Sequence, residues 1–311
     1  MSEWFARNTS ASGDWPLSLI AEIKQEATVA VVIPARNEVD TIAEVISQIR
    51  HELSDIVDEL IVMDSLSDDS TAAEAAGAGA TVFSVADVRP ELGVRKGKGE
   101  ALWKSQFVTT SDLLVFIDAD LTEWGPHFVT GLLGPLLTQP HVQLVRGFYD
   151  RVFDVGGVPT LEGGRVTELV ARPWIAVHRS ELAEVVQPLA GEWAIRRSAL
   201  ERLSVPVGYG IELSTLLDIH QAYGLDAIAQ VDLGRRAHRH QSLYDLAAMA
   251  TEILAVAGRR MRDAPDFVTA NASQPTAGND SVTLKRMSED RLWIERHVAV
   301  NERPRADGFA R

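Results

Sequence analysis

The sequence of 311 residues contains no cysteine. This absence excludes disulfide bonds, thiol catalysis and cysteine-ligated zinc, and it is compatible with a cytoplasmic location. The N-terminus lacks the basic and then apolar pattern of a secretory signal. No apolar window approaches the roughly 20 residues that a membrane-spanning helix needs, and the most apolar one, residues 243–256, contains Asp245 and Glu252. We therefore expect a soluble, cytoplasmic protein.

Basic residues are scarce relative to acidic ones. The chain has 30 lysines and arginines against 44 aspartates and glutamates, a formal net charge of −14. A protein this acidic repels nucleic-acid phosphate overall, so we expect no nucleic-acid partner, and any anionic ligand needs a local basic site. The hydrophobic fraction of 46% is typical of globular proteins, and the length suffices for one large α/β domain with extensions.

Continuous apolar strands alternate with helices in the first half of the chain. The pattern predicts strands over residues 29–33, 58–64, 81–85 and 113–117, with a turn at Pro34 and helices that begin near residues 40, 71 and 97. This alternation is typical of a mostly parallel sheet covered by helices on both faces, and it places the chain in the α/β class. In such sheets ligands bind at the carboxyl ends of the strands.

The second half is less regular. It predicts strands over residues 142–153 and 225–234, a glycine-rich loop and helix over 154–177, a short strand and helix over 188–203, a turn and helix over 208–224, and a basic loop with a long amphipathic helix over 235–261. Residues 1–27 are polar apart from three aromatic residues, which indicates a loosely attached N-terminal arm. From residue 262 to about 282 the composition is typical of a flexible tail.

Two acids, Asp118 and Asp120, follow the apolar run at residues 113–117. A divalent ion offsets the repulsion between such carboxylates, and Mg²⁺ typically takes one or two carboxylates together with substrate phosphates. A metal ion bound to a diphosphate also neutralises charge that builds on this leaving group. Helix capping and solvation beyond the strand is the alternative for so short a motif. The position at the ligand edge of a parallel sheet favours a nucleotide-diphosphate substrate.

Polar residues follow the other strands of the first half as well. Asn37 and Glu38 lie just past the first strand, where they can hydrogen-bond a base or ribose, and Ser65 follows the second. The next helix start carries Arg95, Lys96 and Lys98, and backbone amides and the helix dipole favour phosphate there. In isolation the segment 95–98 could equally be a glycine turn with surface cations, and it is not a Walker A loop. Together, at successive strand ends, these residues predict a nucleotide-sugar site.

The succession "IPARNE", "VMDSLSDDST", "GKGEALWKS" and "VFIDADL" resembles the nucleotide-sugar glycosyltransferases of GT-A fold. Downstream, "EGGRVTELVARP", "QPLAGEWAIRR", "GYGIE" and "LDAIAQVDLGRRAHRH" are similar to the actinobacterial glucosyl-3-phosphoglycerate synthases. Members of this family are retaining enzymes that transfer glucose from UDP-glucose to D-3-phosphoglycerate, and the wider family includes mannosyl-3-phosphoglycerate synthases. The similarity spans about residues 29–261.

This resemblance implies a fold and a division of the chain. The fold is a Rossmann-like, mostly parallel central sheet flanked by helices, followed by an acceptor-binding second half. The implied segments are an N-terminal arm (1–27), a catalytic domain (28–261) with nucleotide-binding (28–125) and acceptor-binding (126–261) halves, and a partly flexible C-terminal tail (262–311). The resemblance also implies Mg²⁺ as cofactor, with Mn²⁺ or Co²⁺ as substitutes, and a homodimer that needs no membrane.

The resemblance assigns donor and metal roles to individual residues. His238 matches a metal ligand of the family and joins Asp120, whereas a histidine in a basic loop is otherwise often a surface residue. The donor site comprises Pro34, Ala35, Asn37, Glu38, Ser65, Lys98, Asp118, Asp120, Leu189, Tyr209 and Arg236. Relatives often have apolar and acidic residues where this chain has Arg36 and Asn37, so the donor preference stays open.

The acceptor carries a phosphate and a carboxylate, and the resemblance places it at residues 164–167. Gly164 allows a close backbone approach, Arg165 can bind an anion through two N–H groups, and Val166 and Thr167 follow at a helix start. His240 stands where the family has an asparagine, which changes the size and titration of an acceptor ligand. The implied catalytic residues are Asp120, Glu212 and Arg165; a surface arginine and a plain helix-start acid are the alternatives for the last two.

No residue stands out as the carboxylate nucleophile that retention of configuration usually suggests. The hypothesis is that the acceptor hydroxyl attacks on the face that the diphosphate leaves, while the protein contributes positioning and electrostatic stabilisation. Four alternatives stay open: a mannosyl transferase that uses GDP-mannose, a transferase for a lipid phosphate, a non-catalytic nucleotide-sugar sensor, and a sugar nucleotidyltransferase. The last would normally have a glycine- and arginine-rich loop after the first strand, and "PARNE" is not one.

Overall fold

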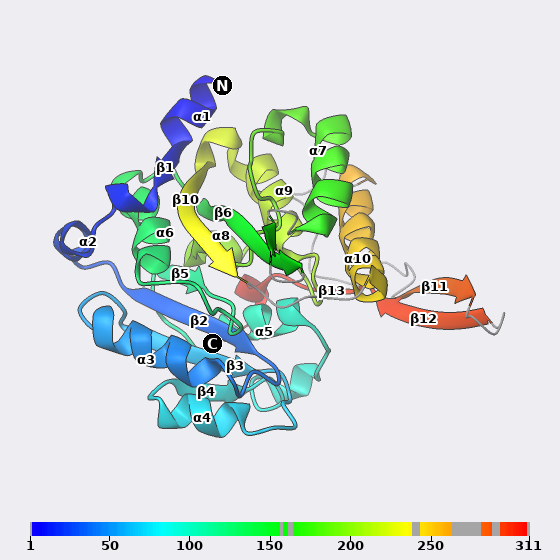
Figure 1. Ribbon diagram of the computed structural model, residues 1–311, viewed down its shortest axis with the longest axis horizontal. Coiled ribbons are helices and arrows are strands. Elements are labelled where there is room, and N and C mark those ends of the chain that lie inside the picture. Colours follow the sequence, from blue (N-terminus) through cyan, green and yellow to red (C-terminus); the bar gives the residue numbers. More distant parts are fainter. Residues whose placement is uncertain are drawn as a thin grey trace.

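The computed structural model describes residues 2–155, 158–160, 164–237, 243–262, 281–287 and 293–309. A central sheet runs through the molecule in the order β1-β10-β6-β8-β5-β2-β3-β4, with helices on both sides of it (Figure 1). The predicted α/β class is confirmed. Among the described residues, none of the helices has the length and apolarity needed to cross a bilayer.

The first half of the chain forms the parallel part of the sheet. Its strands are β2 (Val29–Ala35), β3 (Glu59–Asp64), β4 (Thr81–Ser84) and β5 (Leu113–Phe116), and its helices are α3 (Ile42–Glu52), α4 (Thr71–Gly77) and α5 (Lys98–Ser105), with a 3₁₀ turn, η2 (Pro90–Leu92), before α5. β2 lies between β3 and β5 and is parallel to both. Pro34 was expected to form a turn, but it lies within β2, opposite Met63 of β3.

Alternate residues of β2 enter two different cores. Val31 and Ile33 pack with helix α3 on one face, and Ala30 and Val32 pack with helix α5 on the other. All four are fully buried. Because side chains alternate between the faces of a strand and both faces are covered, the strand reads as a continuous apolar run.

The second half adds antiparallel and parallel strands to the other side of β5. Its strands are β6 (Leu144–Val155), β7 (Val158–Thr160), β8 (Trp193–Arg196), β9 (Val205–Pro206) and β10 (Ile228–Ala237). Its helices are α6 (His127–Thr138), the π-helix η3 (Thr167–Ala171), α7 (Arg172–His178), α8 (Arg197–Leu200), α9 (Ile211–Tyr223) and α10 (Leu243–Arg262), with 3₁₀ turns η4 (Ser180–Leu182) and η5 (Leu225–Ala227). β8 is antiparallel to β5 and β6, whereas β10 is parallel to β6. The predicted strand at 225–234 therefore runs on to Ala237, after a register shift between Asp232 and Arg235.

The N-terminal segment is not a loosely attached arm, and this expectation was wrong. It forms α1 (Glu3–Asn8), β1 (Thr9–Ala11), the 3₁₀ turn η1 (Ser12–Asp14) and α2 (Leu17–Lys24). β1 pairs with β10 as an edge strand of the sheet. The buried Trp4 donates its Nε1–H to the carbonyl oxygen of Leu225 at 3.1 Å. Trp4 and Ile20 thus bury apolar surface that a detached arm would expose.

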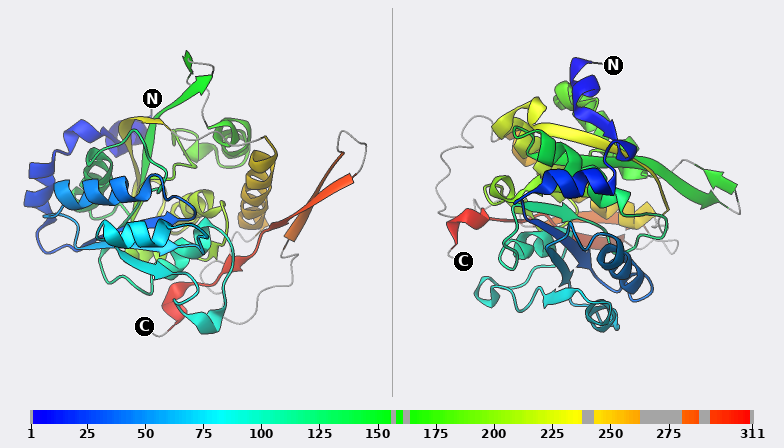
Figure 2. Two further views of the ribbon diagram at one scale, coloured as in Figure 1. Left: turned by 60° about the horizontal axis from the view of Figure 1, so that its bottom comes forward. Right: turned by 90° about the vertical axis from the view of Figure 1, so that its left-hand side faces the viewer.

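The C-terminal segment contains β11 (Ser281–Met287), β12 (Trp293–Ala299), β13 (Glu302–Arg303) and the 3₁₀ turn η6 (Ala306–Gly308). β11 and β12 form an antiparallel hairpin that extends away from the body of the molecule beside α10 (Figure 2). β13 pairs with β9, and Arg303 is buried. The composition of residues 262–282 predicted a flexible tail, and residues 263–280 lie outside the described part of the chain. Within the described residues, β13 and the buried Ala306 pack onto the domain.

Candidate active site

A cavity of about 910 Å³ lies at the carboxyl ends of β2 and β5, the edge at which the sequence predicts a ligand. It brings together most of the predicted site residues from both halves of the chain. The predicted residues that line it are Pro34, Ala35, Glu38, Ser65, Lys98, Asp118, Asp120, Gly164, Arg165, Val166, Thr167, Leu189, Tyr209, Glu212 and Arg236. The strand order explains this gathering, because β2, β5, β8, β6 and β10 are neighbours in the sheet.

One described residue of the predicted site, Asn37, is not part of this lining. Asn37 has a left-handed backbone with φ of 56°, and its side-chain oxygen accepts the N–H of Asp68 at 3.0 Å. Its own N–H donates to Ser67 Oγ at 3.0 Å. Asn37 therefore holds the turn after β2 against the loop after β3. His238 and His240 lie outside the described residues.

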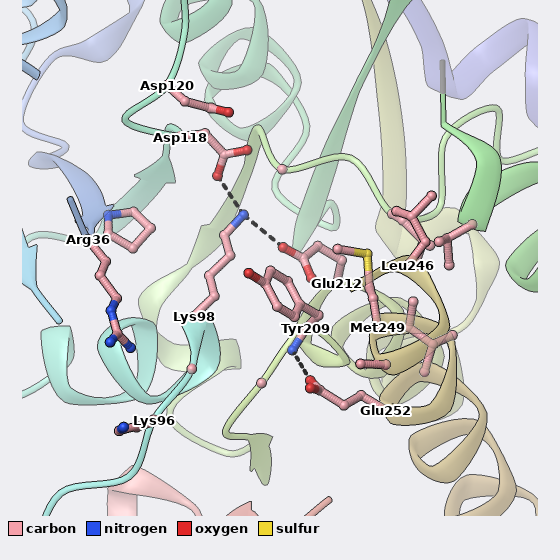
Figure 3. Close-up of a pocket in the computed structure, with 18 of the residues that line it drawn as sticks. Arg36, Lys96, Lys98, Asp118, Asp120, Tyr209, Glu212, Leu246, Met249 and Glu252 are labelled. Atoms are coloured by element: carbon pink, nitrogen blue, oxygen red, sulfur yellow. Dashed lines mark hydrogen bonds and ion pairs between the residues drawn. The ribbon is translucent and has the colours of Figure 1, made fainter. Parts of the chain in front are cut away.

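Lys98 is the centre of one ion-pair group. It is the first residue of α5, and its Nζ lies 2.6 Å from Asp118 Oδ1 and 2.9 Å from Glu212 Oε1 (Figure 3). Burial alone would lower the pKa of Lys98, but the two carboxylates outweigh it and hold this pKa above its ordinary value. Lys98 thus remains a cation at the floor of the cavity.

Arg236 is the centre of a second group and joins the two acids of the motif. Its Nη2 donates to Asp118 Oδ2 and to Asp120 Oδ1, each at 3.0 Å. On its other side, Nη1 lies 3.3 Å from Glu192 Oε1 and donates to Tyr149 Oη at 2.9 Å. Tyr149 in turn donates to Glu192 Oε2 at 2.6 Å. The guanidinium is thereby fixed between the cavity and the buried sheet.

Burial and charge act in opposite directions on the acids of this group. Burial would raise the pKa of Asp118, but Lys98 and Arg236 hold it well below its usual range. Burial raises the pKa of Glu192, and Asp118 adds to this effect while Arg236 opposes it. Asp118 is therefore ionised at neutral pH. Four carboxylates of the cavity and its floor share two cations in the described ranges: Asp118, Asp120, Glu192 and Glu212 against Lys98 and Arg236.

Asp120 fits a divalent metal ion better than Asp118 does. Both oxygens of Asp118 are bound by cations, whereas Asp120 Oδ2 has no hydrogen-bond partner in the part of the chain that the structure describes. The Asp120 side chain is also 29% exposed to the cavity. No cluster of three or more metal-binding side chains occurs among the described residues. The residues present therefore suit an ion that takes one or two carboxylates and completes its shell with substrate oxygens.

The predicted acceptor segment begins at Gly164, whose φ of 78° favours glycine. The π-helix η3 begins three residues later at Thr167, which is buried. Single π-turns inside helices occur frequently at functional sites. Arg165 and Val166, which line the cavity, form the helical residues directly before the π-helix. The expected helix start near residue 167 is confirmed, and its π form was not predicted.

A second set of residues also lines the cavity; of these, Lys96 was expected beside phosphate, and the others were not assigned to the site. Arg36 and Lys96 are exposed cations at the cavity edge, beside motifs that the sequence did identify (Figure 3). Helix α10 contributes Leu246, Met249, Glu252 and Ile253, and β12 contributes Arg296, His297, Val298 and Ala299. The position of Arg36 inside the motif "PARNE" was a signal that could have assigned it to the site. Nothing in the sequence of β12 indicates that it returns to the cavity.

The chain matches known proteins over most of its length. The model of glycosyl transferase family 2 matches residues 30–203. The glucosyl-3-phosphoglycerate synthase of Mycobacterium tuberculosis is 48% identical over 245 residues, which are 78% of this chain and 76% of that protein. The synthase of Mycolicibacterium smegmatis is 46% identical over 81% of this chain and 84% of its own length. That of Petrotoga mobilis is 43% identical over 76% and 74%.

Solved structures agree with the sequence matches. A crystal structure of the Mycobacterium tuberculosis synthase in complex with Mn²⁺, UDP-glucose and phosphoglyceric acid has a TM-score of 0.84 and 41% identity, covering 97% of this chain and 98% of that chain. Another, in complex with Mg²⁺ and UDP, has a TM-score of 0.83 over the same shares. The expected glycosyltransferase fold is confirmed. The chain therefore belongs to the glucosyl-3-phosphoglycerate synthases, within glycosyl transferase family 2.

Proposed function

We propose that this protein transfers glucose from UDP-glucose to 3-phosphoglycerate and needs a divalent metal ion. The observation that carries the proposal is that the ion-paired group of Asp118, Asp120, Lys98 and Arg236 lines the same cavity as residues 164–167. The family relationship supports it, because a relative with 41% identity was crystallised with UDP-glucose, phosphoglyceric acid and Mn²⁺. A second structure of that relative contains UDP and glucosyl-3-phosphoglycerate.

The proposed donor site extends from Pro34, Ala35, Glu38 and Ser65 to Lys98 along the ends of the strands. Asp120 and His238 would hold the metal ion, which when bound neutralises charge on the diphosphate leaving group. Lys98 and Arg236 already lie beside the acids and would face the same diphosphate. Glu212 and Tyr209 would orient the donor, with Leu189 against the sugar.

The proposed acceptor site is the start of η3. Arg165 would bind the phosphate or carboxylate of 3-phosphoglycerate through two N–H groups. Gly164 and Val166 would contribute backbone N–H groups, and Thr167 a hydroxyl. His240 would replace the asparagine of the family as a hydrogen-bond donor to the same acceptor.

We further propose that the configuration of the glucose is retained. The acceptor hydroxyl oxygen bonds to the anomeric carbon on the face from which the diphosphate departs, the bond to the diphosphate oxygen breaks, and that oxygen takes the hydroxyl proton. The carboxylates of Asp118 and Glu212 are both bound by Lys98, so neither is well placed to act as a free nucleophile. The residues of the chain then contribute positioning and electrostatic stabilisation.

The direct test is incubation with 3-phosphoglycerate, Mg²⁺ and either UDP-glucose or GDP-mannose, followed by mass analysis and proton NMR of the product. We expect α-linked glucosyl-3-phosphoglycerate from UDP-glucose. The D120A variant should lose at least about 100-fold in kcat, whereas D55A, at an exposed position without a side-chain partner among the described residues, should not. Product only from GDP-mannose, or binding of UDP-glucose without any turnover, would contradict the proposal.

A homodimer and a cytoplasmic location are also proposed. The side chains of Leu243 and Leu254 on α10 are 66% and 49% exposed, which supports a further contact on this helix. Both substrates are phosphorylated metabolites of the cell interior, which supports the location. Light scattering on the purified protein would measure the assembly, and cell fractionation would test the location.

A further inference from the structure

The loop that carries Tyr209 is fixed on one side by helix α5. The N–H of Glu100 donates to the carbonyl oxygen of Val207 at 2.9 Å, and the N–H of Gly99 donates to that of Gly208 at 3.3 Å. These contacts use amides from the first turn of α5, which have no partner within the helix. Lys98 is the first residue of α5, so the loop and the Lys98 ammonium are positioned together.

Helix α10 fixes the same loop from the other side. Glu252 Oε2 accepts the backbone N–H of Tyr209 at 2.6 Å. A Cβ atom added to Gly208 would lie 1.9 Å from this oxygen, and one added to Gly210 would lie 2.5 Å from Val256 Cγ2. The helix therefore rests directly on the loop backbone. This contact explains why glycines flank Tyr209.

The surroundings of Glu252 differ from those of a carboxylate in a stabilising ion pair. It lines the cavity, is partly buried, and makes no ion pair with the chain as described. Burial raises its pKa, the N–H of Tyr209 opposes the shift, Glu212 adds to it, and Arg296 opposes it. Burying a carboxylate without a cation costs free energy. Within the described ranges, the hydrogen bond that its side chain makes is to the backbone of a residue in the proposed donor site.

We infer that Glu252 is a positioning residue that holds Tyr209 in place for the transfer reaction. Figure 3 shows Tyr209 between Glu252 and the Lys98–Glu212 pair, with the Glu252 carboxylate directed at the Tyr209 nitrogen. Helix α10 directly follows residues 238–242, the segment of the predicted metal and acceptor ligands. Glu252 thus sets the position of the donor-orienting tyrosine relative to the helix that follows these ligands. This inference rests on the proposed function.

Two substitutions of Glu252 distinguish the position of the oxygen that accepts the Tyr209 N–H from the charge of the carboxylate. E252D keeps the charge but withdraws the oxygen by one methylene, whereas E252Q loses the charge but keeps an oxygen at the same reach. A misplacement of reacting groups by about 1 Å can lower the reaction rate about 100-fold. We expect E252D to lower kcat about tenfold and to change KM for UDP-glucose less than about twofold. E252Q should keep at least about half of the wild-type kcat, because an amide oxygen also accepts an N–H.

The measurement is steady-state kinetics on the full chain, with circular dichroism and thermal melts to verify folding. E74D, at an exposed acid of helix α4, is the matched control. In a Y209A background, E252D should lower kcat less than about twofold further, because both changes act through the same ring. The inference is overturned if E252D keeps wild-type kcat, if folded E252Q falls as low as E252D, or if the E252D loss persists in Y209A. A wild-type protein that binds UDP but transfers nothing would instead contradict the proposed function.

Discussion

Replacing Arg303 by methionine tests whether the C-terminal segment is an integral part of the catalytic domain. The Arg303 side chain is 5% exposed. Its Nε and Nη2 donate to the two carboxylate oxygens of Glu100 at 2.7 and 2.6 Å, and its Nη1 donates to the carbonyl oxygen of Leu92 at 2.7 Å. The guanidinium carbon also lies 5.0 Å from the ring centroid of Trp103. R303M removes these polar contacts and keeps an apolar stem.

Glu100 decides the size of the effect. Its side chain is 1% exposed, and the cation left beside it in R303M is Lys104, whose Nζ lies 3.7 Å away. Removing one partner of a buried ion pair costs about 3–5 kcal/mol, because the other charge stays buried without compensation. We expect R303M to lower the free energy of unfolding by this amount. E100Q/R303M should lose less than the sum of the single variants, since the carboxylate that R303M leaves without its arginine is itself neutralised.

Urea unfolding followed by tryptophan fluorescence measures these differences. R305M is the matched control, because the Arg305–Asp307 pair is 44% and 36% exposed and an exposed pair contributes about 0–1 kcal/mol. A loss below about 1 kcal/mol in R303M would refute the reasoning. Strict additivity of E100Q and R303M would refute it as well.

Three further outcomes are expected. Burial would raise the pKa of Glu59, but hydrogen bonds from residues 109–111 hold this pKa below its ordinary value of 4.5. The ionised Glu59 therefore stabilises the fold above pH 4.5, and this stabilisation is lost as the pH falls below that value. In urea unfolding, the difference in stability between wild type and E59Q should become smaller on acidification, and a constant difference would contradict the coupling. G191A should lower kcat at least about tenfold, because its Cβ would lie 2.2 Å from Asp118 Oδ2, whereas G13A, whose Cβ meets nothing within 4 Å, should match wild type in the same assay. Removal of divalent ions with EDTA should abolish transfer, and Mg²⁺ or Mn²⁺ should restore it; product formation in EDTA would contradict the metal requirement.

The sequence predicted those elements in which the order of apolar and polar residues within the segment itself indicates which positions are buried. Residues 29–33 and 113–117 read as strands because both faces of the sheet are covered, so every position is apolar. β1 and β13 have three and two residues, and their strand form comes only from pairing with β10 and β9. Segments this short contain no residue pattern from which a strand can be predicted. The same holds for the packing of Trp4, which in an isolated polar segment resembles an ordinary exposed aromatic residue.

The candidate site divides in a similar way. Lys98 and Asp118 could be predicted because each follows a strong local signal, a glycine-flanked helix start and a buried strand. The Glu192–Tyr149 support of Arg236 could not, because it exists only once β6, β8 and β10 are neighbours. Glu252 looked like a charge that interrupts an apolar helix. The role that we infer for it depends on its hydrogen bond to the backbone of Tyr209, which the sequence does not indicate.

The order of strands in the sheet has a practical consequence for anyone who shortens this protein. A recombinant fragment limited to residues 30–203, the region that the family model matches, would lack both β1 and β10. The long strand β6 would then become a bare edge with free amide and carbonyl groups along its length, a template for aggregation. Such a fragment would precipitate or misfold even though it retains the four motifs from "IPARNE" to "VFIDADL".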